Sequence, residues 1–385
     1  MSGVTSPEGF VAAGVACGIK ASGDPDLSLV ATDDGRPVVA AAVFTSNRAT
    51  AGPVNVSRAH LAATGGRAAA VVLNSGCANA ATGARGDADA ERMCELVAAG
   101  LGCAADEVLV CSTGLIGYHL PMAAVESGIP SLVAARRPHG GPAAAHAIMT
   151  TDTVPKEVSI TVDGYTVGGM AKGAAMLAPD LATMLAVLTT DAVADPDLLV
   201  GQLRAAVAGS FNTIVVDGCT STNDTVIVLA NGRSGRRLDP DVLAEACAEL
   251  AEMMVADAEG GTKVARIRVH RAASDDDARR AARKVAESQL VQCSLYGEDP
   301  YWGRIVSELG SSGAAFDGRL VSVAYGGVVV CRDGIAADHD TAAVAAHLAG
   351  RHVEVTADLG LGEGRAAMLF SDLTPGYIDE NMGTS

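Results

Sequence analysis

The chain is poor in aromatic side chains. Of its 385 residues only 3% are Phe, Trp or Tyr, whereas 49% are hydrophobic, so its core must be built chiefly from Ala, Val and Leu. Alanine-rich helices packed closely against strands of β-branched residues suit that composition. A chain of this length fits one large domain or two of medium size.

Basic residues are also scarce. The formal net charge is −17 at pH 7, and the carboxylates are scattered without forming an acidic tail. This argues against nucleic acid as a partner, because binding to phosphates requires a basic surface. No apolar run approaches membrane-spanning length, and the N-terminal stretch lacks a basic leader. We therefore expect a cytoplasmic protein that does not contact a membrane.

Several motifs of well-known chemistry are missing. The nine cysteines include no C-x-x-C pair and predict buried thiols in a reducing compartment. The stretch GGMAKGAAM (168–176) lacks the residue order of a phosphate loop, and GLGEG (360–364) predicts a hairpin turn. His339 and His347 are too far apart for a helical metal pair, and no G-x-S-x-G elbow occurs. Nucleotide, metal and serine-hydrolase chemistry are all disfavoured.

Strand and helix patterns alternate irregularly. Helix starts are predicted at Asp195-Pro196, Asp239-Pro240 and Ser274, where a capping side chain precedes a helical pattern. Strands are predicted by the apolar runs at 37–44, 69–73, 107–111, 157–162, 213–217, 225–230, 264–269, 320–330 and 352–358. The order indicates α/β or α+β layers that are too uneven for a regular barrel. The Pro- and Gly-rich segment 135–146 is the best linker candidate.

Two polar stretches have the composition of a binding site. CSTGLIG (111–117) follows a predicted strand, and a Ser-Thr-Gly turn places backbone N–H groups beside hydroxyls, as oxyanion holes require. MTTDTVPKEV (149–158) offers hydroxyls, Asp152 and Lys156, which could bind a polar ligand or cap a turn. Taken singly, each stretch also fits an ordinary structural turn.

A threonine interrupts the apolar run APDLATMLAVLTTDA (178–192). Its hydroxyl becomes a strong nucleophile only beside a base, and the α-amino group of an N-terminal threonine is such a base. Attack of Thr183 on the carbonyl of Ala182 would cut the chain and create that amine. From the pattern alone, Thr183 also fits a strand residue whose hydroxyl bonds to nearby backbone.

The segment MAKGAAMLAPDLATMLAVLTTDA (170–192) resembles the self-cleavage motif of the ornithine acetyltransferases of cyclic arginine biosynthesis, the glutamate N-acetyltransferase family. The resemblance extends over nearly the whole chain, because other segments of the family pattern follow in order. These are GIKASG (18–23), VFTSNRA (43–49), LNSGCANAATG (73–83), CSTGLIG (111–117), AHAIMTTDTVPKEV (145–158), STNDT (221–225), ADAEGGTK (256–263), DPYWGR (299–304) and YIDENMGTS (377–385).

The resemblance implies a fold and a processing step. The fold is a layered αββα-type α/β sandwich, as in certain aminopeptidases that have an N-terminal nucleophile. Cleavage between Ala182 and Thr183 would give an α chain of residues 1–182 and a β chain of residues 183–385. The two fragments are expected to stay together and assemble as an α2β2 heterotetramer. Ala175 replaces a glycine of the family pattern and would strain the cleavage loop if that position needs a positive φ.

The resemblance also implies a role for each site residue. Thr183 is the nucleophile, and Thr113 and Gly114 form the oxyanion hole. The substrate-binding positions are Thr150, Lys172, Thr183, Glu259 and Asn381, together with Ser385 if one residue of the family pattern is missing between Asn381 and Ser385.

The implied reaction moves the acetyl group from N2-acetyl-L-ornithine to L-glutamate through an acetyl-threonine, with ping-pong kinetics. No cofactor and no metal are implied. Acetyl-CoA is an alternative co-substrate, because some members of the family accept it. Three other hypotheses remain: an amidase or peptidase on the same scaffold, an uncleaved binding protein, and a paralogous acetyltransferase of specialised metabolism.

Overall fold

The fold is known from a computed structural model that describes residues 3–177 and 184–382. The chain forms two compact units. Unit 1 comprises Met1–Asn212 and Cys219–Met254, and unit 2 comprises Thr213–Gly218 and Val255–Ser385. The predicted linker 135–146 is not a boundary between units. It lies inside unit 1 and contains the start of helix α4 (Gly141–Ala147), whose Ala144 and Ala145 are buried.

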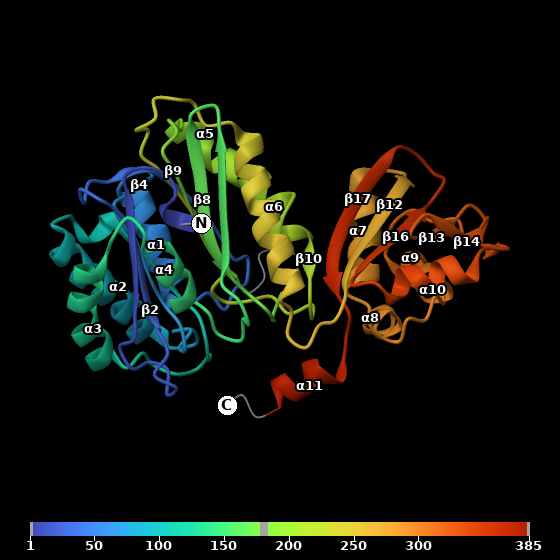
Figure 1. Cartoon of the computed structure of the whole chain (residues 1–385), viewed down its shortest axis with the longest axis horizontal. Coiled ribbons are helices and arrows are strands. Elements are labelled where there is room, and N and C mark those ends of the chain that lie inside the picture. The colour runs from blue at the N-terminus through green and yellow to red at the C-terminus, as the bar shows by residue number, and fades with distance from the viewer. Residues whose placement is uncertain (1–2, 178–183, 383–385) are drawn as a thin grey trace. The chain divides into compact units, whose positions relative to one another are not determined.

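Unit 1 contains two β-sheets (Figure 1). The first has the order β1 (Phe10–Val15), β2 (Leu27–Thr32), β5 (Ala70–Asn74) and β6 (Val108–Ser112). The second has the order β4 (Arg67–Ala68), β3 (Val38–Phe44), β11 (Thr225–Ala230), β9 (Leu185–Thr190), β8 (Tyr165–Lys172) and β7 (Lys156–Val162). Strands β2, β5 and β6 are buried along their whole length, which explains their unbroken apolar sequences.

The two sheets of unit 1 pack face to face between layers of helices. One core joins Leu109 of the first sheet to Ile227 of the second. The other face of the first sheet packs against α1 (Gly52–Ala63), α2 (Gly83–Leu101) and α3 (Met122–Ala135). The other face of the second sheet is covered by α5 (Pro196–Ala208) and α6 (Pro240–Ala256), as Figure 1 shows. The predicted αββα-type sandwich is therefore confirmed in unit 1.

Unit 2 is a two-layer α+β arrangement. Its sheet has the order β10 (Ile214–Val215), β17 (Gly364–Ser371), β12 (Val264–Ala272), β16 (His352–Asp358), β13 (Ser322–Tyr325), β14 (Val328–Arg332) and β15 (Ile335–Ala336). One face packs against helices α7 (Asp275–Ala286), α8 (Gln289–Tyr296), α9 (Gly303–Ser311) and α10 (Thr341–Ala349). Arg266 and Arg268 of β12 project from the opposite face. Helix α11 (Pro375–Asn381) follows β17.

The predicted helix starts are confirmed. Asp195 accepts a hydrogen bond from the backbone N–H of Asp197, with Pro196 in the first turn of α5. Ser274 accepts one from Asp277 N–H, and α7 carries acidic residues in its first turn and basic residues in its last. Each cap satisfies an N–H group that the helix itself leaves unpaired, and the charges of α7 complement its dipole.

Two sequence predictions in unit 2 are wrong. The run 320–330 is a hairpin of two strands, β13 and β14, because Gly326 and Gly327 turn the chain with positive φ angles of 55° and 84°. GLGEG (360–364) is not a hairpin turn, because β12 lies between the strands that this loop connects, β16 and β17. The hairpin is set by a local turn, whereas the outcome at 360–364 is decided by pairing with a distant strand.

None of the nine cysteines forms a disulfide with a described residue. Cys219 and Cys293 are exposed and Cys17 and Cys103 are half-buried, so the prediction of buried thiols holds only for the other five. In the described part of the chain, no helix is long and apolar enough to cross a membrane.

Candidate active site

Thr113 and Gly114 lie in the turn that follows strand β6, as the sequence predicted for the segment CSTGLIG. Thr113 is buried, and its N–H donates to the carbonyl oxygen of Asn74 at 3.0 Å. Gly114 has a φ of 125°, and a Cβ there would lie 2.3 Å from the carbonyl carbon of Gly76. Only glycine fits this turn without strain.

Lys172, the last residue of β8, reaches the same turn from the second sheet. Its Nζ donates to the Thr113 hydroxyl oxygen at 3.2 Å, and its side chain is only 4% exposed. An ammonium group donates hydrogen bonds but accepts none. The Thr113 hydroxyl therefore accepts from Lys172 and must direct its own proton toward a different acceptor.

Asp152 is the centre of a buried ionic cluster beside this turn. One of its oxygens accepts from Lys156 Nζ at 2.6 Å and from Gly173 N–H at 2.7 Å. The other accepts from Thr150 N–H at 3.1 Å and lies 4.0 Å from Lys172 Nζ. Burial alone would raise the pKa of the Asp152 carboxyl, but Lys172, Lys156 and the Gly173 N–H outweigh it and hold the pKa at about 2.

A second buried carboxyl, Asp224, lies at the start of β9 and β11. Its Oδ1 accepts from the N–H of Met184 at 2.8 Å. Burial raises the pKa of Asp224 well above its usual value, although the Met184 N–H, Ser221 and Lys172 each act to lower it. Asp152 and Asp224 thus have pKa values displaced in opposite directions, although the positive charge of Lys172 acts to lower both.

Asn223 ties the neighbouring segments to the Thr113 turn. Its Nδ2 donates to the carbonyl oxygens of Ala78 at 2.6 Å and Ser112 at 2.9 Å. The Ser112 carbonyl belongs to the peptide group that carries the Thr113 N–H, so Asn223 fixes the orientation of that peptide. The segments 73–83, 111–117 and 221–225, which are far apart in sequence, therefore meet here.

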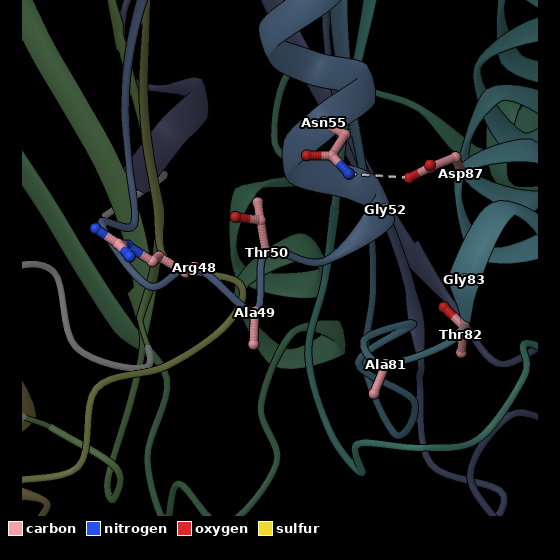
Figure 2. A pocket seen from close by; sticks show the side chains of 9 residues that line it. All are labelled: Arg48, Ala49, Thr50, Gly52, Asn55, Ala81, Thr82, Gly83 and Asp87. Carbon is pink, nitrogen blue, oxygen red and sulfur yellow. Dashed lines mark hydrogen bonds between the residues drawn. The ribbon is translucent and has the colours of Figure 1, made fainter.

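A polar pocket of about 200 Å³ lies between the starts of helices α1 and α2 (Figure 2). Among the described residues, no side chain caps either helix start, and Asn55 donates to Asp87 across the pocket. Its lining residues are Arg48, Ala49, Thr50, Gly52, Asn55, Ala81, Thr82, Gly83 and Asp87. Two of the segments that resemble the family pattern, 43–49 and 73–83, thus contribute to the pocket. Of the predicted catalytic and substrate-binding residues that the structure describes, none lines it.

Two further predicted residues come together in unit 2. Asn381 Nδ2 in helix α11 donates to Glu259 Oε2 at 2.7 Å. Thr374, the N-cap of α11, donates its hydroxyl proton to the carbonyl oxygen of Gly260 at 2.6 Å. A Cβ on Gly260 would lie 2.3 Å from Tyr377 N, so glycine lets the Glu259 loop approach the helix closely.

Of the remaining predicted positions, three are outside the part of the chain that the structure describes and one is inside it. Ala182, Thr183 and Ser385 lie outside the described residues. Ala175 is described and does not have a positive φ; the next residue, Met176, does, at 55°. The expected strain at Ala175 is therefore absent. Asn223 and Asp224 also lie at the site. Sequence reasoning assigned a role to neither residue, although both lie in STNDT (221–225), one of the segments that resemble the family pattern.

The arrangement offers hydrogen-bond donors and charged groups rather than metal ligands. Within residues 3–177 and 184–382, no group of three or more His, Cys, Asp or Glu side chains is placed to hold a metal ion.

Comparison with known proteins identifies the family. The ArgJ family model matches residues 11–383. The chain is 49% identical over 386 residues to the arginine biosynthesis bifunctional protein ArgJ of Thermobifida fusca and 47% identical over 387 residues to that of Streptomyces avermitilis. In both comparisons, 99% of each protein is covered.

A crystal structure of the Bacillus halodurans ArgJ protein is also similar, with 33% identity and a TM-score of 0.50. The match covers 51% of this chain and 98% of that one. The extent of these matches leaves one conclusion. The chain belongs to the ArgJ family.

Proposed function

We propose that the chain is a self-processing acetyltransferase that moves the acetyl group of N2-acetyl-L-ornithine to L-glutamate. The family relationship supports an enzyme of arginine biosynthesis, since the relatives carry that name. The contact that carries the proposal is the one between Lys172 Nζ and the Thr113 hydroxyl, 3.2 Å apart in the turn with Gly114. Because the hydroxyl oxygen accepts from Lys172, the hydroxyl proton remains for another acceptor, as an oxyanion donor requires.

Processing is proposed to start at Thr183. Its hydroxyl oxygen attacks the carbonyl carbon of Ala182, and the peptide C–N bond breaks to leave an ester. Water then hydrolyses the ester, which releases the Ala182 carboxylate and leaves Thr183 with a free amine and a free hydroxyl. The same residue then contains both nucleophile and base.

The sheet pairing supports continued association of the two fragments. A cut after Ala182 falls inside unit 1, between β8 and β9, which pair antiparallel from Lys172 and Leu185 onward. Strand β11 of the second fragment also pairs with β3 of the first. The matched Bacillus chain is only about half as long as this one, as a cleavage product would be.

Catalysis is proposed to follow in two half-reactions. The Thr183 amine takes the hydroxyl proton while the oxygen attacks the acetyl carbonyl of N2-acetylornithine. The Thr113 hydroxyl and Gly114 N–H stabilise the oxyanion, and ornithine leaves with the proton. The glutamate amine then attacks the acetyl ester, and N-acetylglutamate leaves as the Thr183 hydroxyl is restored.

The roles of four residues rest on the resemblance to the family. Glu259 is proposed to pair with a substrate ammonium group, and Thr150, Lys172 and Asn381 to hold the rest of the amino acid. The α2β2 assembly, the cytoplasmic location and the use of acetyl-CoA as a second donor are proposals on the same ground.

Two measurements test the proposal. N-terminal sequencing of the purified protein should find a fragment that begins at Thr183; activity from an uncut chain would overturn the nucleophile assignment. Ornithine release from acetylornithine should require glutamate and be matched by N-acetylglutamate. Equal release without glutamate, with free acetate accumulating, would instead identify an amidase.

A further inference from the structure

We propose that Asp152 and Lys156 are positioning residues for acetyl transfer: they hold Lys172 and the backbone around it so that Lys172 keeps its contact with Thr113. The inference rests on the proposed function and adds two residues to its machinery. Neither residue need touch the substrate, because each acts through another group.

Asp152 connects groups that come from distant parts of the chain. Its carboxylate accepts from the backbone N–H groups of Thr150 and Gly173, two loops that flank the site. It also lies 4.0 Å from Lys172 Nζ, which donates to the Thr113 hydroxyl. One side chain thereby sets the positions of two predicted substrate-binding residues and, through Lys172, of a predicted oxyanion donor.

Lys156 is the partner that the Asp152 carboxylate needs in order to stay charged. The two side chains are 1% and 0% exposed, and they form a hydrogen bond of 2.6 Å. A buried carboxylate without enough opposing charge takes up a proton instead. The charged groups that face Asp152 are Lys156, Lys172 and, more weakly, Lys20, whose ammonium donates to the Met149 carbonyl oxygen at 2.8 Å.

Removal of Lys156 would therefore change the protonation of Asp152. With Lys156 present, the pKa of the carboxyl is about 2, so Asp152 is charged throughout the range in which the enzyme can be assayed. Without Lys156, only Lys172, the more weakly acting Lys20 and backbone N–H groups such as that of Gly173 would offset the desolvation of Asp152, and the pKa of Asp152 would rise. A protonated Asp152 no longer attracts Lys172, and the orientation of the Thr113 hydroxyl is lost.

The test compares Lys156→Met with the wild-type enzyme across pH. We expect kcat for acetyl transfer to fall by about 10- to 100-fold near the acid end, the size of loss found when a partner that orients a metal-binding side chain is removed. We expect kcat to recover as the pH rises, because Asp152 then ionises without its partner. Asp152→Asn should have low kcat with no recovery, since an amide has no proton to lose.

Lys263→Met provides the matched control. Lys263 is also a buried lysine, bonded to Glu298 and to two backbone carbonyl oxygens in unit 2. Whatever its effect on kcat, this variant should retain the pH dependence of the wild-type enzyme. Lys156→Gln replaces Lys156→Met if the latter does not fold, and an SDS gel checks that each variant is processed.

The outcomes separate this inference from the proposed function. A folded and processed Lys156 variant with wild-type kcat and an unshifted acid limb would overturn the positioning role. So would a low kcat that no pH restores, since that result fits general structural damage. If the wild-type protein itself fails to transfer acetyl groups, the proposed function is wrong in the first place.

Discussion

The backbone N–H of Met184 donates to Oδ1 of Asp224 at 2.8 Å, so a buried carboxyl group lies next to the residue that follows the proposed nucleophile. The other oxygen, Oδ2, is buried and has no hydrogen-bond partner among the described residues. A carboxylate in that position would be poorly solvated, which favours the protonated form. Asp224 therefore differs from Asp152, whose lysine partners favour the charged form.

Asp224→Asn should stabilise the fold at neutral pH. The pKa of Asp224 is higher in the folded chain than in the unfolded chain. Above about pH 4, the ordinary carboxyl range, the unfolded chain therefore loses this proton more readily than the folded chain does. The free energy of unfolding then falls. This loss of stability in the wild-type protein grows as the pH rises from that range toward the pKa of Asp224 in the folded chain. The amide removes this loss and still accepts from Met184. The melting temperature of Asp224→Asn should exceed that of the wild-type protein by an amount that grows from about pH 4 to pH 7. A constant or negative difference between the two would contradict the raised pKa.

Asp152→Asn should have the opposite effect. The folded pKa of Asp152 is about 2, below the unfolded value, so its charge contributes stability that is present above about pH 4 and lost as the pH falls toward 2. We expect this variant to melt below the wild-type protein at neutral pH and to approach it in acid. Both measurements belong in a Thr183→Ala background, where a single chain unfolds and fragment dissociation does not shift the midpoint.

Local signals predicted the elements of the fold better than their connections. The caps at Asp195 and Ser274 depend on contacts within one turn, and both are as predicted. The loop 360–364 was misjudged because strand β12, about ninety residues upstream, inserts between its two flanking strands. The hairpin at Gly326 and Gly327 was available from the sequence, since paired glycines within a strand pattern favour a turn.

The site could be predicted only where the chain resembles a known pattern. The spacing of Asp152 and Lys156 carries no signal by itself, because they lie in a loop and at the start of a strand rather than on one helix face. The contact of Lys172 with Thr113 depends on how β8 packs across from β6, which belongs to the other sheet. Asp224 required knowledge of burial, which no short motif gives.

Thr113→Ala should reduce kcat by about 100- to 1,000-fold, the usual effect of losing one oxyanion donor. The fold should tolerate the change, because Lys172, which donates to this hydroxyl, keeps Asp152 nearby as a partner. Thr113→Ser retains the hydroxyl and serves as the control, with kcat within about tenfold of wild type. Steady-state rates of N-acetylglutamate formation decide the matter, and an unchanged kcat in Thr113→Ala would exclude the oxyanion role.

Gly114→Ala should damage both the fold and the reaction. Alanine at a φ of 125° costs about 1–3 kcal/mol, and its Cβ would collide with the backbone of Gly76 and Cys77. Gly117→Ala is the matched control, since Gly117 also has a positive φ, 90°, but a Cβ there meets nothing within 4 Å. Melting temperature should fall in both variants and further in Gly114→Ala. Equal losses in stability and activity would show that the collision at Gly114 is unimportant.

Thr183→Ala should yield an intact and inactive chain, because it removes the hydroxyl that the proposed cleavage and the proposed acetyl transfer both require. The fold should form, since unit 1 is held by the pairing of β8 with β9 and of β3 with β11, which does not need the cut. In the wild-type protein the same pairing should keep the two fragments together, so they should separate on an SDS gel and co-elute on gel filtration. Two fragments from Thr183→Ala would place the cleavage chemistry elsewhere. Separate elution of the wild-type fragments would mean that the shared sheet does not hold them together.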